Sequence, residues 1–266
     1  MMLEPDVELG RRFIEKYQPP GRVLVCAVTG SHHYGFPSPD SDLDLKGIHL
    51  APTASLLGLR PAPETHDRLL EFDGVECDLT THEIQKALSL LLRGNGNMLE
   101  RIHSPFQLFE TPERAELVEL SKGALSKRFF SHYRGFFKGI CHEHEKLGQR
   151  HGKSLLYAYR VALTGVHLLN TGEVIGNLIK LSSLYGFPEA ESLAQRKIRT
   201  AEKVVLSEEE DALHRAAWPR LNALLEEAHQ KSFLPDAPKN EPELNNWLTN
   251  LRLRDLEPCT GRPRSL

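Results

Sequence analysis

Short apolar runs separated by polar turns characterise the first hundred residues of the chain. Residues 23–28 form a compact, valine-rich apolar run that predicts a buried strand, and this run ends at the turn Thr29-Gly30-Ser31. From residue 42, polar and apolar side chains alternate toward residue 50, which is the period of a strand with one buried face. A short helix is predicted over residues 7–17, before the helix-breaking residues 19–21.

A hairpin and a helix are predicted after these two strands. An Asp-Gly pair at residues 73–74 separates the strand-like runs 68–72 and 75–80, and it favours a tight turn because both positions need positive φ. Thr80 and Glu83 have the spacing of a capping box, which predicts that a helix begins there. The buried face and the left-handed cap of this helix are expected at Ile84, Leu88, Leu91, Leu92 and Gly94.

Helical periodicity dominates after Thr111-Pro112, a pair typical of a helix start. An amphipathic stretch covers residues 207–230, and a last helix is expected at 244–256, after a proline-containing linker at 234–240.

The change of pattern along the chain predicts an α/β (α+β) fold in two parts. We expect a mixed sheet with flanking helices over residues 1–110 and a helical domain over 111–256. Residues 257–266 are expected to form a flexible tail.

Composition restricts the function classes only moderately. The 266 residues carry a formal net charge of -3 with 40% hydrophobic residues, which is typical of a soluble globular protein and provides no bulk basic field for nucleic acid. Four scattered cysteines without a CxxC pair argue against a disulfide scaffold and favour a reducing cytoplasm. No apolar run approaches the ~18–20 residues of a membrane span, and the N-terminus lacks the apolar core of a signal peptide. We therefore expect a cytoplasmic protein with no membrane partner.

Acidic residues on the predicted strands carry the chemistry. Asp42 and Asp44 are two residues apart, so strand pleating places both carboxylates on one face, where they repel each other unless a cation lies between them. Oxygen ligands of this kind suit Mg²⁺ or Mn²⁺. Asp78 becomes a third ligand if its strand pairs beside this one, although Glu76 shares its face and is the alternative. Gly30-Ser31 precedes these acids, and a glycine lets backbone N–H groups approach a phosphate closely.

Other polar residues have both a functional and a structural interpretation. His32, His33 and Tyr34 either contact a nucleotide or pack the first turn of a helix, and Lys46 either offsets the acids or is a surface lysine, which we favour. A polar stripe with the period of one helical face binds phosphates or is solvated; its members are Lys153, Tyr157, Arg160 and Thr164.

Two further polar segments are interpreted as structural. Cys141 and His144 share a helical face, but no second ligand pair has zinc spacing, which disfavours a zinc site. Asn95 and Asn97 belong mainly to a turn.

The segment GSHHYGFPSPDSDLDLKGI, residues 30–48, combines Gly-Ser, a spacer and Ser-Asp-x-Asp, and it resembles the DNA polymerase β nucleotidyltransferase superfamily. The fuller string is similar to the RNA-ligase-associated branch, as are VECDLTTHEI, LLRGNGNMLERIHSP, GKSLLYAYRVALTG and SFLPDAPK further along. The resemblance implies two Mg²⁺ or Mn²⁺ ions on Asp42, Asp44 and Asp78, of which Asp78 helps to deprotonate the acceptor. It also implies an NTP substrate bound near Gly30, Ser31, Ser41, Lys153 and Arg160.

These expectations predict an enzyme that transfers a nucleoside monophosphate from an NTP to an acceptor hydroxyl and releases pyrophosphate. An RNA end is slightly favoured as the acceptor, and a small alcohol or a protein hydroxyl are alternatives. A toxin or antitoxin component that nucleotidylates tRNA or protein is a second hypothesis, and a catalytically inactive nucleotide-binding module is a third.

Overall fold

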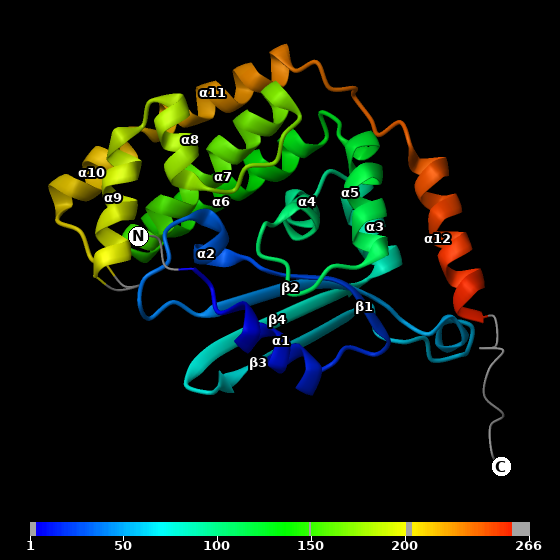
Figure 1. The fold of residues 1–266 in the computed structure, drawn as a ribbon. Coiled ribbons are helices and arrows are strands. Elements are labelled where there is room, and N and C mark those ends of the chain that lie inside the picture. Colours follow the sequence, from blue (N-terminus) through cyan, green and yellow to red (C-terminus); the bar gives the residue numbers. More distant parts are fainter. Residues whose placement is uncertain (1–3, 149, 201–203, 257–266) are drawn as a thin grey trace.

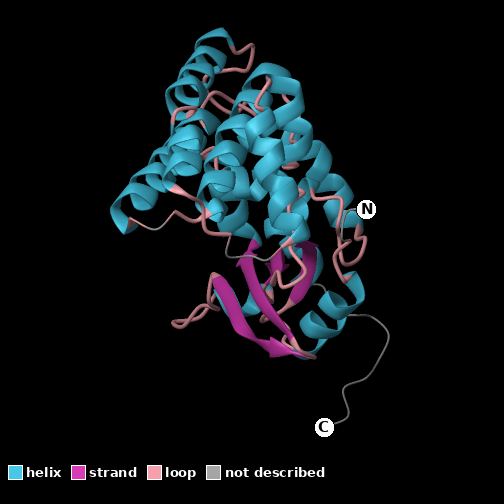
Figure 2. Ribbon diagram, turned by 90° about the vertical axis from the view of Figure 1, so that its left-hand side faces the viewer, coloured by secondary structure: helices cyan, strands magenta, loops and turns pink. Residues whose placement is uncertain are grey.

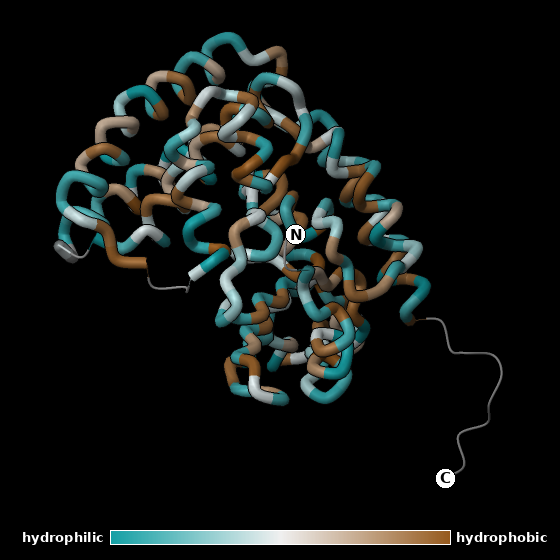
Figure 3. Tube along the Cα trace, turned by 60° about the vertical axis from the view of Figure 1, so that its left-hand side comes forward, coloured by the Kyte–Doolittle hydropathy of each residue, from teal (hydrophilic) through white to brown (hydrophobic). Residues whose placement is uncertain are grey.

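The structure is a computed structural model that describes residues 4–148, 150–200 and 204–256. The predicted tail at 257–266 lies outside these residues. A sheet forms one end of the molecule, and most of the helices are stacked above one of its faces (Figures 1 and 2). Along the helices, hydrophobic and hydrophilic positions alternate in short stretches, as amphipathic elements require (Figure 3). No helix in the described ranges combines the length and apolarity needed to cross a membrane.

The sheet contains the four strands β1 (Arg22–Val28), β2 (Leu43–Leu50), β3 (Thr65–Phe72) and β4 (Val75–Glu83). Their spatial order is β1-β2-β4-β3. β2 pairs antiparallel with β1 and parallel with β4, and β3 pairs antiparallel with β4. The predicted mixed sheet is therefore confirmed.

Helix α1 (Val7–Lys16) covers the apolar face of this sheet. It contributes Phe13 to a small core that contains Leu45 of β2 and Leu79 of β4. Side chains alternate along a strand. The residues next to Leu45 on β2 and next to Leu79 on β4 therefore point to the other face, toward the stacked helices. The acidic positions of β2 and β4 are thus turned away from α1.

The predicted hairpin is confirmed, since Asp73 and Gly74 have φ values of 50° and 82°. The predicted capping box at Thr80 is wrong. Parallel pairing with β2 extends β4 as far as Glu83, so Thr80 lies within a strand. Glu83 itself caps α3 (Ile84–Leu92) by accepting a hydrogen bond from the Gln85 amide.

Most of the remaining helices form the layer above the sheet, whereas the short 3₁₀ turn after β2 packs against the last helix (Figure 1). The remaining helical elements are α2 (Gly30–Tyr34), the 3₁₀ turn η1 (Thr53–Leu56), α4 (Gly96–His103), α5 (Pro112–Ala124), α6 (Phe129–Leu147), α7 (Gly152–Thr171), α8 (Leu178–Tyr185), α9 (Pro188–Arg199), α10 (Glu208–Arg215), α11 (Trp218–Lys231) and α12 (Glu241–Leu256). The amphipathic stretch 207–230 is two helices, because Pro219 is tolerated in the first turn of α11 but not inside one long helix.

One apolar core connects the sheet to the helical layer. It contains Ile48 of β2 as well as Leu99 of α4 and Leu156 of α7. The last helix, α12, returns to the first part of the chain, where Arg252 contacts both carboxylate oxygens of Glu83 at 2.9 and 3.0 Å. The predicted domain boundary at residue 110 stays a prediction.

Candidate active site

Asp44 and Asp78 are direct neighbours in the parallel register of β2 and β4. Adjacent strands are about 4.8 Å apart, so these two carboxylates extend side by side from one face of the sheet. Asp42 immediately precedes β2. Glu76 lies one pleat earlier on β4 and is exposed. The register therefore places Asp78, and not Glu76, beside Asp44.

Lys46 pairs with Asp78 and is not the surface lysine that we favoured. Its Nζ donates to Asp78 Oδ2 at 2.7 Å and to Thr80 Oγ1 at 3.3 Å, and its side chain is only 20% exposed. Burial raises the pKa of Asp44, Lys46 lowers it, and the neighbouring Asp78 and Asp42 raise it. The pKa of Asp44 is raised overall, so a negative charge on its carboxylate is disfavoured at this position.

Gly30 is packed directly against Asp44. Its φ is +60°, and a Cβ at this position would lie 1.8 Å from Asp44 Oδ2. The turn is fixed by the amide of Thr29, which donates to the carbonyl of Asp44 at 2.8 Å. Ser31 follows in the first turn of α2 and is buried. Only glycine fits between this turn and the carboxylate of Asp44.

Lys197 supports the loop that leads to the acids, and sequence reasoning missed it. This α9 lysine is 1% exposed, and its Nζ donates to Phe36 O and Ser38 Oγ, both at 3.2 Å. Ser38 contacts Ser41 Oγ through its hydroxyl and its amide, at 3.0 and 2.9 Å. Ser41 precedes Asp42, so a hydrogen-bond chain connects α9 to the first acid. The 161-residue separation left no local signal for this contact.

A cavity of about 330 Å³ opens directly beside the acids. Its sheet side includes Gly30, Asp44 and Lys46. The helices α2, α4, α6 and α7 complete its wall with Tyr34, Asn97, Glu100, Arg101, Phe136, Ile140, Tyr157 and Arg160.

Arg160 belongs to this wall but is engaged by a buried carboxylate. Its Nη1 donates to Glu100 Oε1 at 2.7 Å, and its guanidinium carbon lies 3.8 Å from the Tyr34 ring centroid. Burial alone would lower the pKa of Arg160, but the Glu100 carboxylate raises it above its ordinary value. The Tyr34 hydroxyl donates to the other oxygen of Glu100 at 2.9 Å. This triad is a rigid, internally neutralised part of the wall.

The first three members of the predicted polar stripe of α7 lie near Asp44 or on the cavity wall, and the fourth does not. Lys153 is exposed and near enough to lower the pKa of Asp44, although burial of Asp44 has the larger, opposite effect. Tyr157 lines the cavity, whereas Thr164 is fully buried and donates to Ile175 O at 3.1 Å.

The residues after Ser31 divide between the two interpretations that the sequence left open. His33 is buried against Gly176, where a Cβ would lie 2.3 Å from His33 Nε2, and burial lowers the His33 pKa. It is a packing residue, whereas Tyr34 lines the cavity.

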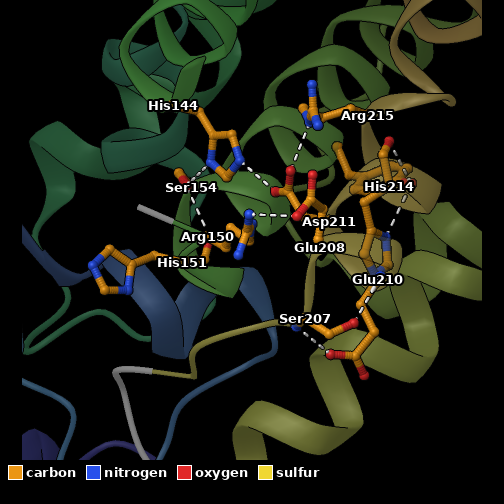
Figure 4. Close-up of polar contacts among 11 residues, drawn as sticks. His144, Arg150, His151, Ser154, Ser207, Glu208, Glu210, Asp211, His214 and Arg215 are labelled. Carbon is orange, nitrogen blue, oxygen red and sulfur yellow. Dashed lines mark hydrogen bonds and ion pairs between the residues drawn. The ribbon is translucent and has the colours of Figure 1, made fainter. Parts of the chain in front are cut away.

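The histidine-rich part of α6 forms a structural network (Figure 4). His144 Nδ1 contacts Ser154 Oγ at 2.6 Å, and Nε2 contacts Asp211 Oδ1 at 2.7 Å. Arg215 Nε donates to Asp211 Oδ2 at 2.7 Å. Both ring nitrogens of His144 are thus occupied, and in the described parts of the chain no three metal-binding side chains surround a common point here. The network joins α6, α7 and α10.

Comparison with known proteins identifies the family. The chain is 24% identical over 223 residues to an uncharacterized protein of Methanocaldococcus jannaschii, a match that covers 83% of this chain and 90% of the archaeal protein. A solved nucleotidyltransferase-like protein from Exiguobacterium sibiricum shares 13% identity at a TM-score of 0.35, over 97% of this chain and 83% of that one. The family model RlaP, described as the RNA repair pathway DNA polymerase beta family, matches residues 8–250. Since this match spans most of the chain, the protein belongs to the RNA repair pathway DNA polymerase beta family, within the nucleotidyltransferase superfamily.

Proposed function

We propose that this protein is a metal-dependent nucleotidyltransferase that moves a nucleoside monophosphate from an NTP to an acceptor hydroxyl and releases pyrophosphate. The observation that carries the proposal is the register of Asp44 beside Asp78, with Gly30 packed against Asp44. This arrangement combines an acidic pair with a phosphate-cradle turn at one edge of the cavity.

The residues at this site fit divalent metal ions by their chemistry. Asp42, Asp44 and Asp78 supply only carboxylate oxygens, which suit Mg²⁺ or Mn²⁺. Asp78 already holds a cation, the ammonium group of Lys46, at 2.7 Å. Among the described residues no three metal-binding side chains surround one point, so binding of a shared ion would require the three carboxylates to rearrange, and Asp78 would exchange the ammonium of Lys46 for the ion. When bound, two such ions would supply charge neutralisation for the triphosphate and a lower pKa for the acceptor hydroxyl.

The protein's own groups then bind and orient the reactants. The amides near Gly30 and Ser31 would donate to the triphosphate, and the Ser41 hydroxyl lies at the same edge. Lys153 would face the far phosphates, as the resemblance implies. The oxygen of the acceptor hydroxyl would attack the α-phosphorus while Asp78 accepts the hydroxyl proton, and pyrophosphate would leave.

An RNA end is the acceptor that we favour, because the family is described as belonging to an RNA repair pathway. A nucleotidylating toxin or antitoxin remains the second hypothesis, and its acceptor would be a tRNA or a protein.

A label-transfer assay tests the proposal. The protein would be incubated with each α-labelled NTP, Mg²⁺ or Mn²⁺, and RNA or protein acceptors, and label on the acceptor would be measured. We expect transfer to RNA that Asp44→Asn and Asp78→Asn abolish, while Glu76→Gln, an exposed carboxylate one pleat away, retains it. Loss of transfer in Glu76→Gln but not Asp78→Asn would reassign the third acid. Wild-type protein that binds no NTP and transfers no label would refute the proposed function.

A further inference from the structure

We infer that the cavity beside Asp44 binds the nucleobase of the NTP, stacked on Phe136, and that Asn97 contacts the edge of the base. This inference rests on the proposed function and deepens it by naming the residues that hold the base. It also separates the binding site into an apolar part for the base and a charged part for the phosphates.

The charges on the helical wall of this cavity do not favour a triphosphate. A triphosphate carries about four negative charges and requires cations that are free to compensate them. Arg160 is already neutralised by Glu100 at 2.7 Å, and Arg101 directs Nη1 at the Gly47 carbonyl at 3.0 Å. The buried Glu100 and Arg160 compensate each other, so this pair offers an entering anion no net positive charge. The cavity therefore suits an uncharged part of the substrate.

Apolar side chains from α6 and α7 give the cavity a stacking surface. Phe136 is 48% exposed and lies on the cavity wall beside Ile140, so its ring is accessible to a ligand in the cavity. Its ring lies 4.8 Å from the His132 ring, so it is supported from within its own helix. Tyr157 continues the wall from α7. An aromatic face of this kind can stack on any of the four bases, because every base has a π surface.

Asn97 adds a polar group to this apolar surface. It is in the first turn of α4, where its backbone N–H donates to Asn95 Oδ1 at 3.0 Å and fixes the local backbone. Its side-chain amide lies on the cavity wall and offers both donors and an acceptor, the combination that base edges require. The volume of about 330 Å³ lies within the range of small-molecule sites, roughly 300–1,000 Å³. Because Gly30 and Asp44 line the same cavity, a base bound here places its α-phosphate beside the acids.

Binding experiments that compare an NTP with a ligand lacking a base test this assignment. Dissociation constants for ATP, GTP, CTP, UTP and inorganic tripolyphosphate would be measured by calorimetry with Mg²⁺ and without acceptor. We expect Phe136→Ala to weaken NTP binding about tenfold, within the contribution of one base–aromatic stack, and to leave tripolyphosphate binding unchanged. Phe136→Trp should restore NTP binding. Asn97→Ala should reduce the differences among the four NTPs.

Two controls separate the possible outcomes. Phe233→Ala removes an aromatic ring that is 68% exposed and lies outside the cavity wall, so it should change the binding of neither ligand. Lys153→Ala should weaken NTP and tripolyphosphate alike. If Phe136→Ala weakens the binding of NTP and tripolyphosphate equally, changes the binding of neither, or raises only the KM of the acceptor, the base does not bind here. Wild-type protein that binds no NTP would instead refute the proposed function itself.

Discussion

Replacing Lys197 by methionine should separate the folding of this protein from the positioning of its acids. Methionine has a similar length but cannot donate the hydrogen bonds to Phe36 O and Ser38 Oγ. Each hydrogen bond from a charged donor contributes about 1.5–3 kcal/mol, so the loss amounts to at least ~3 kcal/mol. In a protein of this size, 1 kcal/mol shifts the Tm by about 2–4 °C, and we expect a decrease of at least about 6 °C.

Activity should fall more than stability alone explains, because the lysine supports the loop that ends at Ser41 and Asp42. A misplacement of about 1 Å near the chemistry costs on the order of 100-fold in rate, and we expect such a loss in kcat together with weaker Mg²⁺ activation. Tm would be measured by scanning calorimetry and kcat by label transfer at a temperature where the variant is folded.

A matched control comes from the other end of the molecule. Arg252→Met also removes a long cation from a buried contact, since it leaves Glu83 unpaired. It should lower the Tm but leave kcat unchanged, because its contact is remote from the acids. If Lys197→Met lowers the Tm and retains wild-type kcat and Mg²⁺ dependence, then Lys197 is structural only and the positioning argument fails.

Two further predictions concern the acids and their turn. The raised pKa of Asp44 means that the folded state binds this proton more tightly than the unfolded state, so stability decreases as pH rises through the carboxyl range. Asp44→Asn should therefore raise the Tm in EDTA at neutral pH, and the gain should be smaller at acidic pH. The variant should also lose the stabilisation by Mg²⁺. A Tm below that of the wild type at neutral pH would contradict this sign. Gly30→Ala should lower kcat about 100-fold, because its Cβ would collide with Asp44. Gly74→Ala has a similar positive φ but open space around the new Cβ, so it should cost stability alone, and equal kcat losses in both variants would refute the argument.

Local periodicity was sufficient to predict the strands and the direction of the acids. Alternation along β2 and β4 places Leu45 and Leu79 on the α1 side and Asp44 and Asp78 on the other, as expected. From the sequence, Asp78 becomes a third ligand only on the condition that its strand pairs beside the strand of Asp44. Local periodicity cannot decide this, because register depends on contacts between segments that are far apart in the chain. The structure satisfies that condition.

Errors arose where a distant partner changes the role of a residue. Thr80 has capping-box spacing, but pairing with β2 keeps it in a strand and places its hydroxyl beside Lys46. Lys46 has the local pattern of a surface lysine, yet Asp78 of β4 pairs with it at 2.7 Å. In each case the deciding contact comes from another element, and no local pattern reports it.

The register of the acids has an energetic consequence that the rest of the site has to accommodate. Two adjacent carboxylates repel each other, and partial burial strengthens the repulsion because less water screens it. The backbone cannot relieve it by moving, since Asp44 is held by the Thr29 amide, by both neighbouring strands and by the close approach of Gly30. Protonation or a cation relieves it, and among the described residues Lys46 pairs with Asp78, while Lys46 and Lys153 both lower the pKa of Asp44. A divalent ion would relieve the same repulsion, and this supports the metal-dependent transfer that we propose.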